Sequence, residues 1–184
     1  MMKRIIPPVK IYFCMFILLV NLLFDILYVN NLFILIFVSG TKVGLNMIWK
    51  VKPDVDDINK FNKNTLAANL GIQVLEFGDD FVKARMPVDN RTRQPLGLLH
   101  GGASVVLSES VGSLASWLVI GDQSKSVVGI EVNANHLKSV GDGFVYSITR
   151  PVRIGRTLHV WNTEIFDEKE NLICVSRLTV MVKG

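Results

Sequence analysis

The chain has 184 residues, a hydrophobic fraction of 49% and a formal net charge of +4. This length provides one domain with a proper core and is too short for two ordinary domains. Four basic residues and one acidic residue lie within positions 1–46, whereas positions 47–184 carry 16 basic and 15 acidic residues. The nearly balanced charge after position 46 excludes the basic surface that nucleic-acid binding requires, so no nucleic-acid partner is expected.

The first 46 residues differ in composition from the rest of the chain. They contain no Ala, Glu, Gln, His or Trp, and residues 11–38 are long enough to cross a bilayer, which needs about 20 apolar residues. Basic residues precede this run, as in a signal anchor or signal peptide, but Asp25 near its middle is costly in a membrane. Three interpretations stay open: a membrane anchor at about residues 11–38, a cleaved signal ending near Gly40, or an extension upstream of a true start at Met47. We divide the chain into an apolar leader, residues 1–46, and a domain, residues 47–184.

The domain is expected to begin with a short helix and a hairpin. Residues 54–68 suit a helix with Asp54 as its N-cap. The apolar side of this helix would be formed by Ile58, Phe61 and Leu66. Residues 72–77 and 80–86 are typical of two strands joined by a tight turn at Gly78-Asp79. Residues 87–97 have turn residues and no clear period, which predicts a loop.

Residues 100–118 form the only long helical candidate. Apolar residues at helical spacing, among them Leu107, Val111 and Leu118, cover one wide face. Much of the remaining surface is small, so a sheet can wrap closely around the helix (Ala103, Ser104, Gly112, Ser113 and Ser116).

Four strands are expected to follow this helix, over residues 127–137, 144–150, 158–166 and 172–182. The first of them alternates through Val128, Ile130, Val132 and Ala134. One long helix against one antiparallel sheet gives a two-layer α+β architecture. The two cysteines, Cys14 and Cys174, are interpreted as reduced packing residues, because one lies in the leader and the other in a strand.

A single carboxylate, Glu109, stands on the long helix nine residues after His100. Its neighbours are small and apolar, and no basic residue occurs between positions 94 and 124. A solvated helix face would show several charges, so a functional carboxylate is favoured. The triplet His100-Gly101-Gly102 stands at the helix start, where free N–H groups and the helix dipole favour an oxyanion. Taken alone, the triplet is equally typical of a loop-to-helix turn.

Three stretches of the sequence carry a resemblance to a known family: MPVDNRTRQPLGLLHGGASVVLSES, VVGIEVNANHLKS and EIFDEKENLICVSRLT. From Met47 to the end, the chain resembles the hotdog-fold acyl-CoA thioesterases, in which an antiparallel sheet wraps one long central helix. The most similar group comprises bacterial enzymes that act on aromatic acyl-CoA, such as 1,4-dihydroxy-2-naphthoyl-CoA of menaquinone biosynthesis, or on an aryl carrier protein. The resemblance implies a hydrolase without cofactor whose partners are an acyl-CoA substrate and a second copy of the chain.

The resemblance also implies roles for the residues around the long helix. Glu109 would be the base or the nucleophile, and the sequence does not separate these two roles. The Gly101 amide would donate to the oxyanion, with His100 and Gln94 holding the thioester carbonyl. Ser113, one turn after Glu109, would orient the carboxylate or the water, although a buried packing role explains it equally well. A thiol with a pKa near ~8.5 leaves without a strong acid, so one carboxylate is sufficient.

Contacts with coenzyme A are implied at two places in the chain. One is the strand over residues 127–137 and its end, and the other is the stretch RPVRIGR. The implied contact residues are Val128, Asn135, His136, Leu137, Lys138, Arg153, Gly155 and Arg156. Arg150 belongs to the same basic stretch, which is otherwise equally typical of a solvated edge.

The spacing of Gly101 and Glu109 predicts a dimer. Eight residues along a helix correspond to about 12 Å, whereas a base and an oxyanion donor must both lie about 3 Å from the reacting group. Two antiparallel central helices related by a two-fold axis would bring Glu109 of one subunit to Gly101 of the other. We therefore expect a homodimer with shared sites, and association into a tetramer stays open.

Other functions remain to be compared with this one. An α/β-hydrolase is excluded because the chain has no G-x-S-x-G motif, and a hotdog dehydratase is disfavoured by the position of Glu109. A carrier-protein proofreading or broad acyl-CoA thioesterase stays open, as does a non-catalytic acyl-CoA-binding module. No metal is expected, because the histidines lack ligand spacing. The need for coenzyme A favours the cytoplasm, and a membrane contact is expected only if the leader is real.

Overall fold

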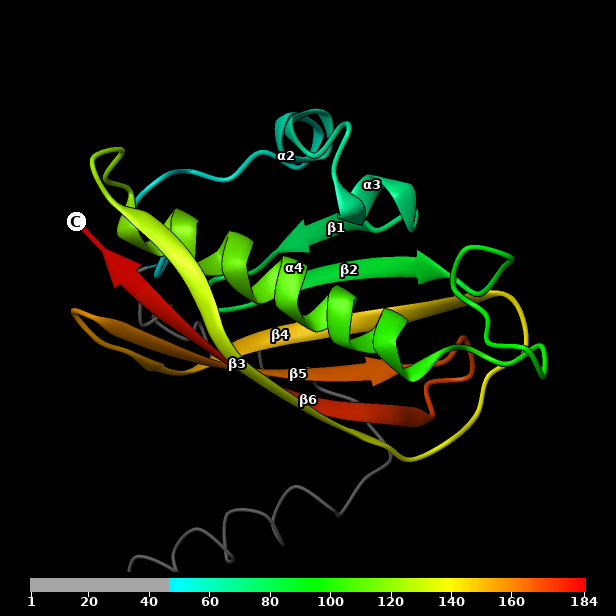
Figure 1. Cartoon of the computed structure of the whole chain (residues 1–184). Coiled ribbons are helices and arrows are strands. Elements are labelled where there is room, and N and C mark those ends of the chain that lie inside the picture. Colours follow the sequence, from blue (N-terminus) through cyan, green and yellow to red (C-terminus); the bar gives the residue numbers. More distant parts are fainter. Residues whose placement is uncertain (1–46) are drawn as a thin grey trace, which may run out of the picture. The chain divides into compact units, whose positions relative to one another are not determined.

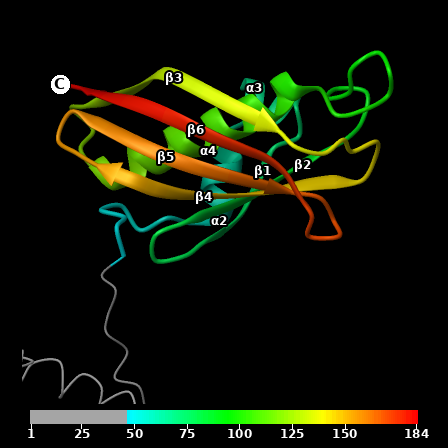
Figure 2. The same ribbon diagram turned by 90° about the horizontal axis from the view of Figure 1, so that it is seen from below.

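The computed structural model describes residues 47–184 (Figure 1). The predicted leader, its anchor at about 11–38 and Cys14 lie outside the described residues. One antiparallel sheet holds six strands in the order β1-β2-β4-β5-β6-β3, and the long helix α4 runs along one face of it (Figures 1 and 2). The elements are α2 (Val55–Phe61), α3 (Leu66–Asn69), β1 (Gln73–Phe77), β2 (Val82–Pro87), α4 (Gly101–Ile120), β3 (Ser126–His136), β4 (Phe144–Ile154), β5 (Leu158–Phe166) and β6 (Leu172–Lys183). The predicted α+β architecture is confirmed.

Helix α4 is fixed at both ends and along its buried face. The His100 side chain caps its first turn, and Gly121 ends it in the left-handed conformation with φ 58°, as is common at helix C-termini. Leu107, Val111 and Leu118 are fully buried against the sheet, as predicted. A Cβ placed on Gly112 would lie 2.6 Å from Leu178 Cδ2 of β6, so glycine allows the close approach of helix and sheet.

Within residues 47–184, α4 is the one helix that is long and apolar enough to cross a membrane. Its mean hydropathy is 1.5, and 56% of the apolar window is buried inside the domain. The Trp161 indole on β5 donates a buried 2.7 Å hydrogen bond to Ser116 Oγ of α4. Because α4 packs on the sheet in this way, its hydropathy is that of a core helix.

The first predicted helix is divided in two. Asn64 adopts a positive φ of 63°, which asparagine tolerates better than most residues, and Thr65 then caps α3. Asp54 caps α2 as predicted, since its side chain accepts from the Asp57 N–H at 3.0 Å. The predicted apolar side is confirmed only at Ile58. Phe61 is 76% exposed and Leu66 is 58% exposed, so for these two residues the prediction was wrong.

Two of the predicted strands differ in detail from the structure. In β3 the register shifts between Gly129 and Glu131, and this bulge reverses the alternation that the sequence suggested. Val128 and Ile130 are therefore exposed, at 41% and 51%, while Val132 and Ala134 pack against the core. Strand β4 continues beyond the predicted end at position 150 to Ile154, so the basic stretch RPVRIGR is mostly strand.

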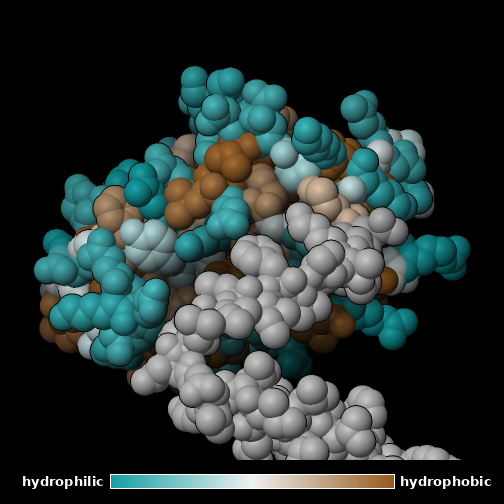
Figure 3. Space-filling view, turned by 180° about the vertical axis from the view of Figure 1, so that it is seen from behind, coloured by the Kyte–Doolittle hydropathy of each residue, from teal (hydrophilic) through white to brown (hydrophobic). Residues whose placement is uncertain are grey.

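The surface seen from behind in Figure 3 mixes hydrophilic side chains with smaller apolar patches. Such a mixture is usual for a folded domain, whose surface always retains much apolar area. Inside, Cys174 of β6 is a buried free thiol, and burial raises its pKa. The prediction of a reduced packing cysteine is confirmed at this position.

Candidate active site

A cavity of about 390 Å³ opens at the N-terminus of α4. It is enclosed by the loop before α4, the first turn of the helix, the end of β3 and the segment that follows β3. Five of the predicted site residues line it: Gln94, Gly101, His136, Leu137 and Lys138. Several apolar residues of the lining, among them Leu98, Val140 and Ile173, were not predicted from the sequence, because they come from three separate segments of the chain.

Near the start of α4, the acceptor atoms of two side chains are occupied by backbone N–H groups: Gln94, which lines the cavity, and His100, the N-cap of the helix. The Gly102 N–H donates to His100 Nδ1 at 2.8 Å, and the Leu96 N–H donates to Gln94 Oε1 at 2.5 Å. A neutral imidazole that accepts at Nδ1 carries its hydrogen on Nε2, and an amide that accepts at Oε1 donates through Nε2. Both side chains therefore keep a donor for a ligand.

Gly101 adds a third donor to the same end of α4. As the first residue of the helix, it has an N–H with no intrahelical acceptor. A Cβ placed on Gly101 would lie 2.6 Å from His136 Nε2. The imidazole of β3 thus stands directly against the Gly101 backbone, and a larger residue at position 101 would displace it. Three donors and the positive end of the helix dipole suit a carbonyl oxygen that gains negative charge.

Lys138 is held at the cavity by an acidic residue of the β5–β6 turn that the sequence did not single out. Its Nζ lies 3.3 Å from Asp167 Oδ2. Desolvation raises the pKa of the Asp167 carboxyl, but hydrogen bonds from Asn171, Lys138 and the Lys169 backbone outweigh it and lower the pKa to about 2. A carboxylate with this pKa is charged at neutral pH, so it fixes both the turn and the ammonium group.

Glu109 lies away from this cavity, farther along α4. Its carboxylate contacts the backbone of Gly129 on β3, and its side chain is half-buried. Ser113, one turn later, is half-buried as well. Residues 101–109 are all helical, so the eight residue steps from Gly101 to Glu109 separate the two by about 12 Å along the axis.

The strand pairing shows that the predicted residues fall into two groups at opposite ends of the sheet. His136 pairs with Cys174, which pairs with Ile165, and this row lies at the Gly101 end. Gly129 pairs with Val180, and Val180 pairs with His159 at the start of β5, and this row lies at the Glu109 end. We call them the donor end and the carboxylate end.

The carboxylate end also contains most of the predicted basic contacts. Arg153, Gly155 and Arg156 surround the turn between β4 and β5, which adjoins the row of Gly129 and His159. The side chains of Arg153 and Arg156 are exposed. Arg150 is different, because its guanidinium lies 2.5 Å from Asp80 Oδ1 and over the Phe81 ring. Arg150 is therefore engaged within the chain.

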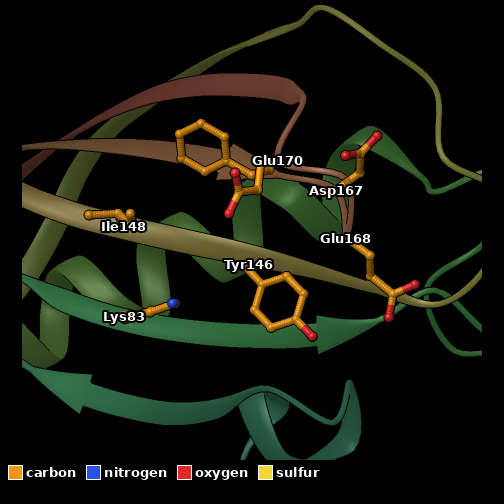
Figure 4. A pocket seen from close by; sticks show the side chains of 7 residues that line it. Lys83, Tyr146, Ile148, Asp167, Glu168 and Glu170 are labelled. Atoms are coloured by element: carbon orange, nitrogen blue, oxygen red, sulfur yellow. The ribbon is translucent and has the colours of Figure 1, made fainter.

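A larger cavity, of about 690 Å³, lies on the sheet face that points away from α4 (Figure 4). Tyr146, Ile148 and Phe166 supply apolar surface, and Lys83 lies opposite acidic residues of the β5–β6 turn. None of the predicted site residues lines this cavity. It has no helix N-terminus and therefore lacks the donors that distinguish the cavity at Gly101.

Comparison with known proteins agrees with this geometry. The family model described as "Thioesterase superfamily" matches residues 96–174. The chain is 48% identical over 136 residues to the 1,4-dihydroxy-2-naphthoyl-CoA hydrolase of Escherichia coli, a match that covers 74% of this chain and 99% of the relative.

Solved structures give the same result. A thioesterase from Haemophilus influenzae superimposes with a TM-score of 0.73 at 44% identity, over 75% of this chain and 96% of that one. A mutant thioesterase from Pseudomonas aeruginosa gives 0.72 at 46% identity, over 73% and 97%. With a hotdog fold and these relatives, the chain belongs to the thioesterase superfamily and is a thioester hydrolase.

Proposed function

We propose that the protein hydrolyses acyl-CoA thioesters with an aromatic acyl group, of the type of 1,4-dihydroxy-2-naphthoyl-CoA. The observation that carries this proposal is the grouping of three donors at the start of α4: Gln94 and Gly101 line one cavity, and His100 caps the helix next to Gly101. The printed name of the Escherichia coli relative supports the aromatic acyl group.

The reaction requires both ends of the sheet. The thioester carbonyl accepts from the Gly101 N–H and is polarised by His100 and Gln94, while Glu109 acts as base on water or as nucleophile. Since about 12 Å of helix separates Gly101 from Glu109, the carboxylate comes from a second copy of the chain. Ser113 of that copy then stands beside Glu109 and orients it or the water.

Within residues 47–184, one edge of strand β3 has no pairing strand and offers the surface for such a dimer. Strand β3 is 11 residues long and stands at one edge of the sheet (Figure 2). Its outer residues Val128 and Ile130 are 41% and 51% exposed, and a long apolar edge of this kind favours pairing with another strand. Antiparallel pairing of two β3 strands buries this edge in a homodimer.

The two groups of predicted residues constrain how the β3 strands pair. His136 marks the donor end and Gly129 marks the carboxylate end of the same strand. Bringing each donor end to the partner's carboxylate end places the two-fold axis midway between them, near Val132. A two-fold axis at that position completes two equivalent sites per dimer. Two such dimers can associate further into a tetramer without changing the sites.

The same pairing assembles a binding surface for coenzyme A. Asn135, His136, Leu137 and Lys138 lie at the donor end of one subunit. The partner contributes Val128, Arg153, Gly155 and Arg156 from its carboxylate end. The arginines are exposed and suit phosphate groups, and the chain segment after β3 suits the pantetheine arm.

We further propose that the thioesterase unit comprises residues 47–184 and works in the cytoplasm, where acyl-CoA substrates are found. The alignment with the Escherichia coli hydrolase supports these bounds, because 136 residues of this chain cover 99% of that protein. The N-terminal sequence of the native protein distinguishes a start at Met47 from a retained leader.

The test is a panel of acyl-CoA substrates assayed with the wild type and with Glu109→Ala. We expect the highest kcat/KM with dihydroxynaphthoyl-CoA, and a loss of at least about 100-fold in Glu109→Ala with coenzyme A binding retained. Preference for an acyl carrier protein over every acyl-CoA would favour a proofreading enzyme. A wild type that binds coenzyme A and hydrolyses none of these thioesters would refute the proposal in favour of a binding module.

A further inference from the structure

We propose that His136 is a catalytic residue that stabilises the leaving thiolate. In this role its Nε2–H donates a hydrogen bond to the sulfur while the carbon–sulfur bond breaks. The inference rests on the proposed function, because it requires a thioester carbonyl at the Gly101 N–H. It gives His136 a part in the chemical step in addition to a contact with the coenzyme.

The position of the imidazole is the first argument. A Cβ placed on Gly101 would lie 2.6 Å from His136 Nε2, 3.0 Å from Cδ2 and 3.1 Å from Cε1. The nitrogen is the nearest ring atom, so the ring presents its Nε2 edge to the residue that binds the carbonyl oxygen. The sulfur is bonded to the same carbonyl carbon, and it therefore lies within reach of any group that contacts Gly101.

The course of the cavity is the second argument. Besides Gly101 and His136, the lining includes Leu137, Lys138 and Ser139, which follow His136 in the chain. The Lys138 ammonium at this wall is paired with Asp167 at 3.3 Å, and an ammonium has three N–H groups, so it keeps donors for polar groups of the coenzyme arm. The sulfur is the first atom of the departing arm, so it lies on the His136 side of the carbonyl.

The other donors are on a different side of the carbonyl. Gln94 and His100 approach from the loop that precedes α4, and each is fixed by a backbone N–H group. His136 is the last residue of β3 and approaches from the sheet. The loop donors serve the oxygen, and the donor from the strand remains for the sulfur.

The step balances without a further reactant. The oxyanion of the tetrahedral intermediate re-forms the carbonyl, and the electron pair of the carbon–sulfur bond passes to sulfur. The thiolate accepts the Nε2–H hydrogen bond as its charge develops, and it takes a proton from water after it departs. A hydrogen bond from Nε2 to the developing thiolate is stronger than one to the sulfur of the neutral thioester. An interaction that strengthens in the transition state in this way accelerates the reaction.

The experiment compares two benzoyl thioesters that lack the nucleotide of coenzyme A. S-benzoyl-N-acetylcysteamine has an alkyl thiol that leaves poorly, whereas S-(4-nitrophenyl) thiobenzoate has an acidic thiol that leaves without help. We expect His136→Ala to lower kcat by about 10- to 100-fold on the first ester and by less than about 3-fold on the second. His136→Gln retains an N–H donor, so its kcat on the first ester should be about tenfold higher than that of His136→Ala.

Lys138→Ala, a change in the same cavity, is the contrast. Its loss should appear as a higher KM for benzoyl-CoA, with no discrimination between the two small esters. An equal loss on both small esters in His136→Ala, or a loss confined to KM for benzoyl-CoA, would overturn the inference. Unchanged thermal unfolding of each variant shows that the fold is retained. If the wild type hydrolyses no thioester the proposed function fails, whereas an active wild type with an indiscriminate His136→Ala loss refutes only the role of His136.

Discussion

At the start of α4, backbone N–H groups occupy the acceptors of two side chains and thereby fix the direction of their donors. His100 Nδ1 accepts from Gly102, and Gln94 Oε1 accepts from Leu96. In the proposed reaction neither side chain would need to reorient when a carbonyl oxygen arrives, which is the preorganisation that oxyanion stabilisation requires. The sequence predicted both residues through a family resemblance, but the backbone partners depend on the loop conformation and could not be read from spacing.

Gln94→Glu tests this arrangement, because it keeps the acceptor for the Leu96 N–H and removes the donor for the substrate. We expect kcat for an aromatic acyl-CoA to fall by about 100-fold or more, as is typical when one oxyanion donor is lost. Gln94→Ala also loses the acceptor for the Leu96 N–H. Its kcat should nevertheless fall no further than that of Gln94→Glu. Steady-state kinetics of Gln94→Glu that stay within about threefold of the wild type would show that Gln94 is not a carbonyl donor.

Among the elements, β4 shows why some bounds were not predictable. The predicted strand over residues 144–150 ends just before Pro151, and proline cannot donate to a ladder. Strand β2 pairs with β4 only as far as Thr149, and beyond it β4 is paired on one side, with β5. Pro151 thus stands where one edge is free, and the strand continues through a bulge to Ile154. The long, strongly patterned elements were predictable, whereas bulges and local edges follow from tertiary pairing.

Strand β5 carries a buried titratable group. His159 is 2% exposed and stacks edge-on against Trp161, with 6.4 Å between ring centroids. Desolvation lowers its pKa, against a hydrogen bond with the Gly155 backbone. The folded state therefore binds a proton at His159 less readily than the unfolded chain does. Above the unfolded pKa of about 6.5, His159 is neutral in both states and does not affect the free energy of unfolding. As the pH falls below that value, the unfolded chain takes up the proton first, so the free energy of unfolding decreases.

We therefore expect the free energy of unfolding of the wild type to fall between pH 7 and pH 5. In His159→Leu, which keeps an apolar side chain of similar reach, this decrease should be smaller. Denaturant unfolding at both pH values provides the measurement. Parallel pH profiles for the two proteins would mean that His159 does not take part in the acid sensitivity.

At the scale of the whole molecule, the predicted site residues of one chain lie in two groups, at opposite ends of the sheet. Helix geometry in the sequence predicted this division for Gly101 and Glu109. The residues proposed to contact coenzyme A are divided in the same way, because Lys138 lies at the donor end while Arg153 and Arg156 lie at the carboxylate end. The sequence could not reveal that second division, since it depends on which strand ends adjoin in the sheet.

Heterodimers provide the most direct test of a shared site. One chain carries Glu109→Gln, the other carries Gly101→Pro, and different tags allow purification of the mixed dimer. Proline is tolerated at the first position of a helix and removes the N–H donor, and its ring also displaces His136. Each homodimer should be inactive. The mixed dimer contains one intact site, formed by Gly101 of the first chain and Glu109 of the second, so its kcat should be about half that of the wild type. A mixed dimer of verified composition that is as inactive as its parents would contradict the account.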